Sequence, residues 1–262
     1  MATTDSHVWQ GRPWTNGGAV VVAALVAALI AFGMHVAATD SPTRIDAPVQ
    51  SSSLRPAKRL SPPPPPPLTP TVLVPGRHQA ALTFDDGPTA YTDQILDILG
   101  TRGVKATFFP AGVHISERPS TLRRVATEGH SVQNHLWSHT ALTSLSTGGI
   151  QTELQRAAQA ITSVGAPWPT CYRPPYWAMD SRVRAAAAAI GFQEITWNVD
   201  TEDYLRPSPW TITQRALASA DGRGLIILLH DGGGNRANTV AALPAIIDGL
   251  RARGYQFVRL CN

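Results

Sequence analysis

AALTFDDGP, the stretch from Ala80 to Pro88, decides the fold of this chain. Its first five residues form an apolar run that predicts a buried strand, and the Gly-Pro pair at its end predicts a turn. Asp85 and Asp86 stand between the strand and the turn. Reactive groups of parallel α/β proteins gather at this end of the strands, so the stretch predicts such a fold with a site beside the two aspartates.

Short β-rich runs alternate with amphipathic stretches through the rest of residues 74–262. The runs that we expect to be strands are Gln79–Phe84, Ala106–Pro110, Ser131–Asn134, Thr170–Arg173, Gln193–Asn198, Leu225–His230 and Gln256–Leu260. The stretches that we expect to be helices are Thr92–Gly100, Ser120–Glu128, Ile150–Val164, Ser181–Ile190, Thr211–Ala220 and Thr239–Arg253. This alternation predicts a parallel sheet with helices outside it, and seven such units are enough to close a barrel.

Polar side chains follow one rule along these predicted strands. Each lies at the C-terminal end of a predicted strand or directly after it. These residues are Asp85, Asp86, His135, Arg173, Asp200, His230 and Asp231. The carboxyl ends of parallel strands meet at one rim, so we expect these groups to lie together there.

The second motif of the site is His135-Leu136-Trp137-Ser138-His139. Two histidines four residues apart can meet on one side of a helical turn or a tight loop. Two imidazoles and one carboxylate are the ligand set of a hydrolytic metal site that keeps a position open. One aspartate of the Asp85-Asp86 pair would then remain free to act as a base.

The composition limits the classes of function. The chain has 262 residues, a net charge of +4 and a pI of about 9.4. The residues from Pro75 onward are almost balanced in charge, which argues against a nucleic-acid-binding face. The chain has two cysteines, Cys171 and Cys261. We expect two separate thiols, with a single bridge that ties down the C-terminal strand as the alternative outside the cytoplasm.

The N-terminal third is not typical of a globular domain. Residues 1–16 are read as a short cytoplasmic tail and residues 17–38 as a transmembrane signal anchor, with a cleaved signal peptide as the alternative. Residues 39–73 are a Ser/Pro-rich linker whose run Pro62–Pro67 favours a stiff polyproline II spacer. We expect residues 74–262 to be a catalytic domain on the extracytoplasmic face of a single-pass membrane protein, or secreted if the segment is cleaved.

Five ordered motifs resemble those of the polysaccharide deacetylases, the NodB-homology domains of carbohydrate esterase family four. They are Thr83-Phe84-Asp85-Asp86-Gly87-Pro88, His135-Leu136-Trp137-Ser138-His139, Arg173-Pro174-Pro175-Tyr176, Trp197-Asn198-Val199-Asp200 and Leu228-Leu229-His230-Asp231. The resemblance covers essentially all of residues 79–260. It implies a distorted (β/α)7 barrel, one divalent metal ion and hydrolysis of acetyl groups on carbohydrate.

The resemblance also implies a role for each site residue. Asp86, His135 and His139 are expected to hold the metal, which we read as Zn²⁺ with Co²⁺ or Mn²⁺ as alternatives. The residues expected to take part in catalysis are the base Asp85, the acid His230, Arg173 that orients the base, Asp200 that tunes the acid, and the backbone N–H of Tyr176 that binds the oxyanion.

Four positions lie close to these groups without a predicted catalytic role. Trp177 and Tyr204 depart from the family motifs and are expected to line the substrate groove. Asp231 is expected to cap the start of a helix. The run Gly232-Gly233-Gly234-Asn235 lacks the lysine and hydroxyl residue of a phosphate-binding loop and is expected to be a flexible loop at the rim.

The expected function is removal of N-acetyl groups from a cell-wall polysaccharide, with N-acetylglucosamine of peptidoglycan as the substrate. A chitooligosaccharide deacetylase and an acetylxylan O-esterase are the alternatives within the class. A glycan-binding wall protein without catalysis is the alternative from another class. We expect a monomer that binds an N-acetylated glycan, contacts the membrane through its N-terminal helix and binds no nucleic acid.

Overall fold

The computed structural model describes residues 78–261, which form an α/β fold with parallel strands. Strand β1 (Gln79–Asp85) lies at the centre and pairs with β2 (Thr107–Phe109) on one side and β7 (Leu225–His230) on the other. The remaining strands of this sheet are short: β3 (Ser131–Val132), β6 (Val199–Asp200) and β8 (Gln256–Phe257), which pairs with the first residues of β1. The sheet order is β3-β2-β1-β7-β6.

A second, two-stranded sheet contains β4 (Cys171–Tyr172) and β5 (Gln193–Glu194). An isolated parallel bridge between Asn134 and Tyr172 joins it to the chain that follows β3. Among residues 78–261, no ladder joins β5 to β6. The parallel α/β class predicted from the sequence is therefore confirmed, while the ring of strand pairings has a gap at this point.

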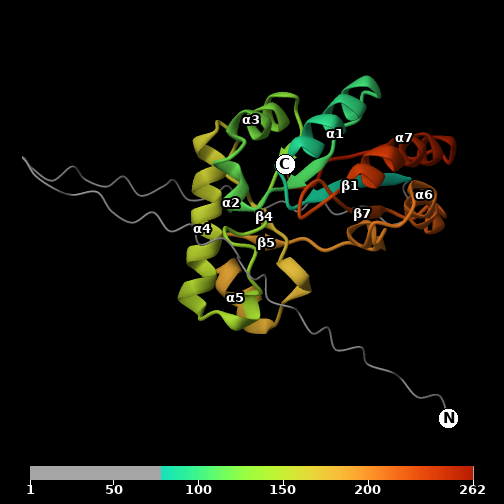
Figure 1. The fold of residues 1–262 in the computed structure, drawn as a ribbon. Coiled ribbons are helices and arrows are strands. Elements are labelled where there is room, and N and C mark those ends of the chain that lie inside the picture. The colour runs from blue at the N-terminus through green and yellow to red at the C-terminus, as the bar shows by residue number, and fades with distance from the viewer. Residues whose placement is uncertain (1–77, 262) are drawn as a thin grey trace, which may run out of the picture. The chain divides into compact units, whose positions relative to one another are not determined.

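Six of the helices were expected from the sequence and surround the strands (Figure 1). They are α1 (Ala90–Thr101), α3 (Pro119–Thr127), α4 (Thr147–Ser163), α5 (Ser181–Ala188), α6 (Pro209–Ala218) and α7 (Ala237–Ala252). Four one-turn elements were not expected: α2 (Gly112–Ile115) and the 3₁₀ turns η1 (Leu142–Ser144), η2 (Pro175–Trp177) and η3 (Asp203–Leu205). Elements of three or four residues are too short to show a hydrophobic period.

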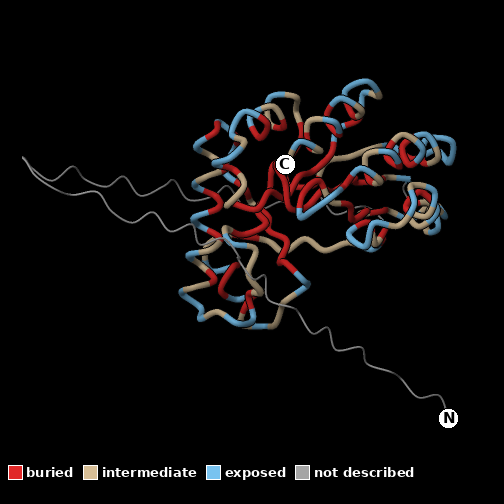
Figure 2. Tube along the Cα trace, viewed as in Figure 1, coloured by how far each residue is buried: buried red, intermediate tan, exposed pale blue. Residues whose placement is uncertain are grey.

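The buried residues are concentrated on the strands and the inner faces of the helices (Figure 2). The larger apolar cluster lies between the central sheet and α1, α3, α6 and α7, with the rings of Phe84 and Phe108 stacked 5.0 Å apart. A smaller cluster packs α4 and α5 around Tyr172 and Leu136. The larger cluster packs against β1 and the smaller one against β4, so both strands are held by buried side chains.

The C-terminal segment is fastened to the strands by a disulfide bond between Cys171 and Cys261. The expectation of two separate thiols is therefore wrong. The chain brings together two cysteines that are 90 residues apart because the C-terminal residues run past β2 and β3. Backbone groups of Leu260 contact the side chains of Thr107 and Ser131, and the carbonyl of Cys261 accepts a hydrogen bond from Gln133.

None of the helices within residues 78–261 is long and apolar enough to cross a bilayer. The predicted tail, membrane segment and linker at residues 1–16, 17–38 and 39–73 lie outside the described residues.

Candidate active site

The site begins where β1 ends. Asp85 is the last residue of the strand, and Asp86 leaves it in a left-handed conformation with φ 76°. The backbone N–H of Gly87 donates to Oδ1 of Asp231 at 3.0 Å, which holds the turn after the strand. Because of this turn, the adjacent carboxylates of Asp85 and Asp86 point in different directions and contact different residues.

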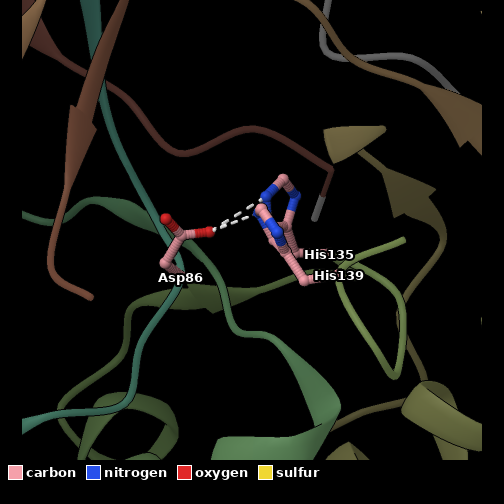
Figure 3. A group of neighbouring side chains, drawn as sticks. All are labelled: Asp86, His135 and His139. Carbon is pink, nitrogen blue, oxygen red and sulfur yellow. Dashed lines mark ion pairs between the residues drawn. The ribbon is translucent and has the colours of Figure 1, made fainter. Parts of the chain in front are cut away.

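The two histidines approach Asp86 from the loop after β3. Nδ1 of His135 lies 2.8 Å from the carbonyl oxygen of Arg173. A carbonyl only accepts, so this nitrogen carries the hydrogen and Nε2 is left with a lone pair. Nδ1 of His139 lies 3.0 Å from the phenol oxygen of Tyr176. Both Nε2 atoms face the carboxylate of Asp86 (Figure 3).

The three side chains form a centre that suits a cation. Oδ1 of Asp86 lies 3.2 Å from Nε2 of His135 and 2.9 Å from Nε2 of His139, and the three donor atoms all lie within 4.8 Å of one another. Oδ1 is buried and accepts no hydrogen bond within the described part of the chain. Three electron pairs that converge without a proton donor are what a divalent metal ion requires, so these residues fit one.

The charge on Asp86 agrees with this assignment. Burial alone would raise the pKa of Asp86, but hydrogen bonds and charge from His135 and His139 in their protonated forms outweigh burial and hold that pKa well below its usual value. A divalent cation that takes the place of those two protons would supply the same attraction. The carboxylate is therefore ionised at neutral pH and available as a ligand.

Asp85 has a different partner. Its Oδ1 accepts a hydrogen bond of 2.8 Å from Nη1 of Arg173, which also donates to Oγ1 of Thr83 at 2.9 Å. The other oxygen, Oδ2, lies 4.0 Å from Nε2 of His135. Asp85 is thus fixed through one oxygen and presents the second toward the metal ligands, which is the arrangement needed for a base.

Arg173 is fully buried, and each of the three guanidinium nitrogens donates at least one hydrogen bond. Nε and Nη2 donate to the carbonyls of Ile195 and Thr196 at 3.4 and 3.2 Å, and the guanidinium carbon lies 4.3 Å from the ring centre of Phe109. Burial lowers the pKa of Arg173, while the charge of Asp85 opposes that change. The predicted contact between Arg173 and Asp85 is present.

His230 lies at the end of β7 and pairs with Asp203. Its Nδ1 is 2.7 Å from Oδ1 of Asp203, and its backbone N–H donates to Oδ2 at 2.8 Å. Thr239 donates a further hydrogen bond of 2.7 Å to the same Oδ2. Burial lowers the pKa of His230, but the hydrogen bond and charge of Asp203, together with the charges of Asp85 and Asp86, outweigh burial and raise it to about 9. His230 is therefore protonated at neutral pH, as an acid must be.

The prediction that Asp200 tunes His230 is wrong. Asp200 is exposed, and its side chain accepts a hydrogen bond from the backbone N–H of Glu202 at 2.8 Å. The chain leaves β6 after Asp200 and turns through η3, which brings Asp203 rather than Asp200 against the imidazole. No motif used in the sequence analysis included Asp203, although it is only three residues further on.

Asp231 holds the loops of the rim in place. Its Oδ2 accepts a hydrogen bond of 2.6 Å from Oγ1 of Thr92 in the first turn of α1, in addition to the contact with Gly87. Burial, together with the charges of Asp86 and Asp85, raises the pKa of Asp231 to about 7. This side chain therefore links the turn after β1 to the first turn of α1.

The glycine run after Asp231 packs against the metal ligand. A Cβ on Gly232 would lie 2.0 Å from the carbonyl oxygen of Asp86, and one on Gly233 would lie 2.4 Å from its Oδ2. The buried side chain of Arg236 donates to the carbonyls of Gly232 and Gly233 at 2.6 and 3.0 Å. The loop that we expected to be flexible is thus tied down, and its glycines are required by close approach. The sequence offered no signal for Arg236.

Exposed aromatic side chains surround this centre. Tyr176 and Trp177 both have positive φ angles, and Trp177 lies edge-on to Trp197 with ring centres 4.8 Å apart. Tyr204 lies edge-on to His230 at 5.6 Å. Tyr204 therefore lies next to the proposed acid, while Trp177 packs against Trp197 directly after Tyr176, whose ring contacts His139.

Comparison with known proteins agrees with this site. Residues 74–195 match the family model described as polysaccharide deacetylase. Peptidoglycan-N-acetylglucosamine deacetylase PgdA of Listeria monocytogenes is 38% identical over 181 residues, which are 69% of this chain and 37% of that protein. Chitooligosaccharide deacetylase of Rhizobium leguminosarum bv. trifolii is 38% identical over 186 residues, which are 66% of this chain and 86% of that protein.

A solved structure extends the likeness to the fold. The crystal structure of the Bc1960 peptidoglycan N-acetylglucosamine deacetylase superposes with a TM-score of 0.68 at 32% identity, covering 71% of this chain and 88% of that one.

The fold and the site together define a parallel α/β domain with a candidate centre for a divalent metal ion. The chain belongs to the polysaccharide deacetylase family, also called the NodB-homology or carbohydrate esterase four family. It spans 37% of the length of the Listeria relative and 86% of that of the Rhizobium relative.

Proposed function

We propose that this protein hydrolyses N-acetyl groups of a cell-wall polysaccharide, with N-acetylglucosamine of peptidoglycan as its substrate. One observation carries the proposal: Asp86, His135 and His139 converge within 4.8 Å, beside an arginine-held carboxylate and a histidine that the fold keeps protonated. The names of the Listeria relative and of the Bc1960 structure support the choice of glycan.

Asp86, His135 and His139 would hold one divalent metal ion, which we propose to be Zn²⁺. Such an ion polarises a carbonyl oxygen and lowers the pKa of a water molecule. The donor set of two imidazoles and one carboxylate is common for zinc in hydrolases, and Co²⁺ or Mn²⁺ accepts the same set.

The remaining residues divide the proton transfers between them. Asp85 takes the proton of the attacking water, and the hydrogen bond from Arg173 keeps its free oxygen directed into the site. His230 gives its proton to the leaving nitrogen, which is a poor leaving group until it is protonated. The backbone N–H of Tyr176 is our candidate donor to the developing oxyanion.

We further propose that the domain works outside the cytoplasm, tethered to the membrane by residues 17–38 through the linker at 39–73. The apolar composition of the first segment and the Ser/Pro content of the second support this placement. A cleaved segment would give a secreted enzyme with the same catalytic domain.

A chitooligosaccharide is the second candidate substrate, because the Rhizobium relative carries the name of such a deacetylase and shares 38% identity with this chain. Both candidate substrates present the same N-acetylglucosamine unit, so the reaction and the roles of the residues are the same for either.

Acetate release by the purified full-length protein tests the proposal. The enzyme is stripped with a chelator, reloaded with Zn²⁺ and offered peptidoglycan, N-acetylglucosamine oligomers and acetylated xylan in parallel. We expect metal-dependent release of acetate that is fastest from peptidoglycan, with the Asp85→Asn variant as the inactive control. Release from xylan esters alone, or none from any glycan by the metal-loaded protein, would refute the proposal.

A further inference from the structure

We propose that the phenol of Tyr176 is a positioning group for the metal site, in addition to the backbone role already given to this residue. Its oxygen holds Nδ1 of His139 and so fixes the direction in which that imidazole offers its other nitrogen. The inference rests on the proposed metal site formed by Asp86, His135 and His139.

The contact between Tyr176 and His139 has two parts. The phenol oxygen lies 3.0 Å from Nδ1 of His139, and the two rings meet edge-on with centres 4.8 Å apart and an interplanar angle of 76°. If Nε2 is to bind a cation, the hydrogen of the neutral ring must sit on Nδ1. With a cation on Nε2, Nδ1–H can donate to the phenol oxygen, and this bond orients the ring and stabilises that tautomer.

The two metal histidines are held in different ways. His135 is almost wholly buried and donates to a backbone carbonyl, which no substitution removes. The side chain of His139 is 28% exposed, against 4% for His135. Water can therefore reach His139 and bind either ring nitrogen, so its orientation depends on a side chain. Tyr176 is the side chain that bonds its Nδ1 in residues 78–261.

The backbone around Tyr176 is built to present this side chain. Pro174 and Pro175 precede it and fix their own φ angles, and Tyr176 then adopts φ 58° and ψ 16°. Side chains other than glycine seldom adopt this left-handed conformation, and where it occurs it marks functional sites. A hydrogen bond from Ala178 N–H to the carbonyl of Pro175 at 3.0 Å closes the turn.

Tyr176 consequently serves two parts of the site. Its backbone N–H is our candidate donor to the acetyl carbonyl, while its phenol holds a metal ligand. The residue is 71% exposed, so a glycan that reaches the site can contact it. A glycan that shifts this turn would act on the metal ligand and the oxyanion donor at once.

The test is the metal affinity of Tyr176→Phe, which removes the oxygen and keeps the ring. The full-length protein is titrated with Zn²⁺ and Co²⁺ in competition with a chromophoric chelator, and the Co²⁺ absorption bands are recorded. We expect the variant to bind metal about 10- to 100-fold more weakly, with altered Co²⁺ bands. Thermal unfolding of the metal-free proteins should be the same for both.

Tyr91→Phe is the matched control. Tyr91 carries another phenol at this rim, whose oxygen bonds Asn235 at 3.1 Å and contacts none of the three ligands. Its removal should leave the metal affinity unchanged. Equal affinities for Tyr176→Phe and the unaltered protein would overturn the inference while leaving the proposed function in place. Failure of the unaltered protein to bind metal more tightly than His135→Ala would overturn both.

Discussion

Two adjacent aspartates, Asp85 and Asp86, receive opposite partners at the end of β1. Asp85 accepts a hydrogen bond from a buried guanidinium, and Asp86 faces two imidazoles that offer lone pairs. A cationic donor keeps a carboxylate ionised and oriented, whereas a group of acceptors needs a metal ion between its members. The difference in surroundings is the basis for assigning Asp85 as the proposed base and Asp86 as the proposed metal ligand.

Asp85→Asn should therefore keep its metal and lose its turnover. An amide is nearly isosteric with the carboxylate and can still contact Arg173, but it cannot take a proton. We expect kcat to fall by about 10²- to 10⁴-fold with an unchanged ratio of bound metal to protein. Metal analysis and acetate release on the same sample measure both quantities, and retained turnover would remove Asp85 from the role of base.

The pair formed by His230 and Asp203 predicts a pH dependence. His230 works as an acid in its protonated form, and its pKa of about 9 means that activity is lost as the pH rises through about 9. In Asp203→Asn the largest favourable contribution to this pKa is gone, while burial still lowers the pKa and only the charges of Asp85 and Asp86 still raise it. The loss of activity should then move to a pH clearly below 9.

Asp200→Asn is the control for this experiment, since the side chain of Asp200 accepts a hydrogen bond from the backbone of Glu202 and is not among the groups that shift the pKa of His230. The rate of acetate release measured from pH 5 to 10 should show the same alkaline limb for Asp200→Asn and the unaltered enzyme. An alkaline limb that moved in Asp200→Asn and stayed in place in Asp203→Asn would restore the role first predicted for Asp200.

Motif spacing located the site residues that follow directly on a strand. Asp85, Asp86, His135, Arg173 and His230 all come together at the rim where the sequence analysis expected them. The contact of Asp203 with His230 was not predicted, because the position of Asp203 depends on the three-residue 3₁₀ turn η3. The path of such a turn is set by contacts with Thr239 and β7 that are distant in the sequence.

At the scale of the elements, the loop between β7 and α7 supports the metal ligand. Gly232 and Gly233 touch Asp86, and Arg236 fastens their carbonyls. The loop lacks side chains because Asp86 occupies the space, and not because a phosphate must bind there. Its rigidity is therefore part of the geometry of the metal site.

Gly233→Ala should weaken metal binding, because its Cβ would fall 2.4 Å from Oδ2 of Asp86 and displace the carboxylate. Gly234→Ala is the matched control: it also has a positive φ, but its Cβ would meet only Arg236, at 4.0 Å. The left-handed backbone costs each variant about 1–2 kcal/mol of stability. Zn²⁺ titration should show weaker binding for Gly233→Ala and unchanged binding for Gly234→Ala. Equal affinities of the two variants would argue against a role of the loop in holding Asp86.

The elements that the sequence predicted well are the long ones. Both strands with six or more residues and all six amphipathic helices lie within a few residues of their predicted positions. The stretch expected as one strand over Gln193–Asn198 is instead β5, a loop, and then β6 at Val199–Asp200. Two-residue strands exist through pairing with distant partners, so no local pattern marks them.

At the scale of the whole molecule, the disulfide bond joins β4 to the C-terminal residues. Cys171 is two residues before Arg173, so the bond anchors the strand that holds the base. The sequence alone could not decide whether the two cysteines form a disulfide. Their pairing depends on the cellular compartment and on a fold that brings distant residues together.

Removal of this bond should lower the free energy of unfolding by about 2–4 kcal/mol. The double variant Cys171→Ser/Cys261→Ser should unfold at a lower denaturant concentration than the oxidised protein. A reducing agent should lower the midpoint of the unaltered protein and leave that of the double variant in place. An unaltered protein that is insensitive to reduction would show that the bond contributes no stability.

Arg173 also bridges the gap in strand pairing between β5 and β6. While Nη1 reaches β1, its other nitrogens bond the carbonyls of Ile195 and Thr196 in the connection between those strands. A lysine has a single nitrogen and cannot reproduce these bonds. A substitution at Arg173 would therefore loosen the link between β5 and β6 and release the carboxylate of Asp85 at the same time, so at this position the closure of the strands and the orientation of the proposed base cannot be altered separately.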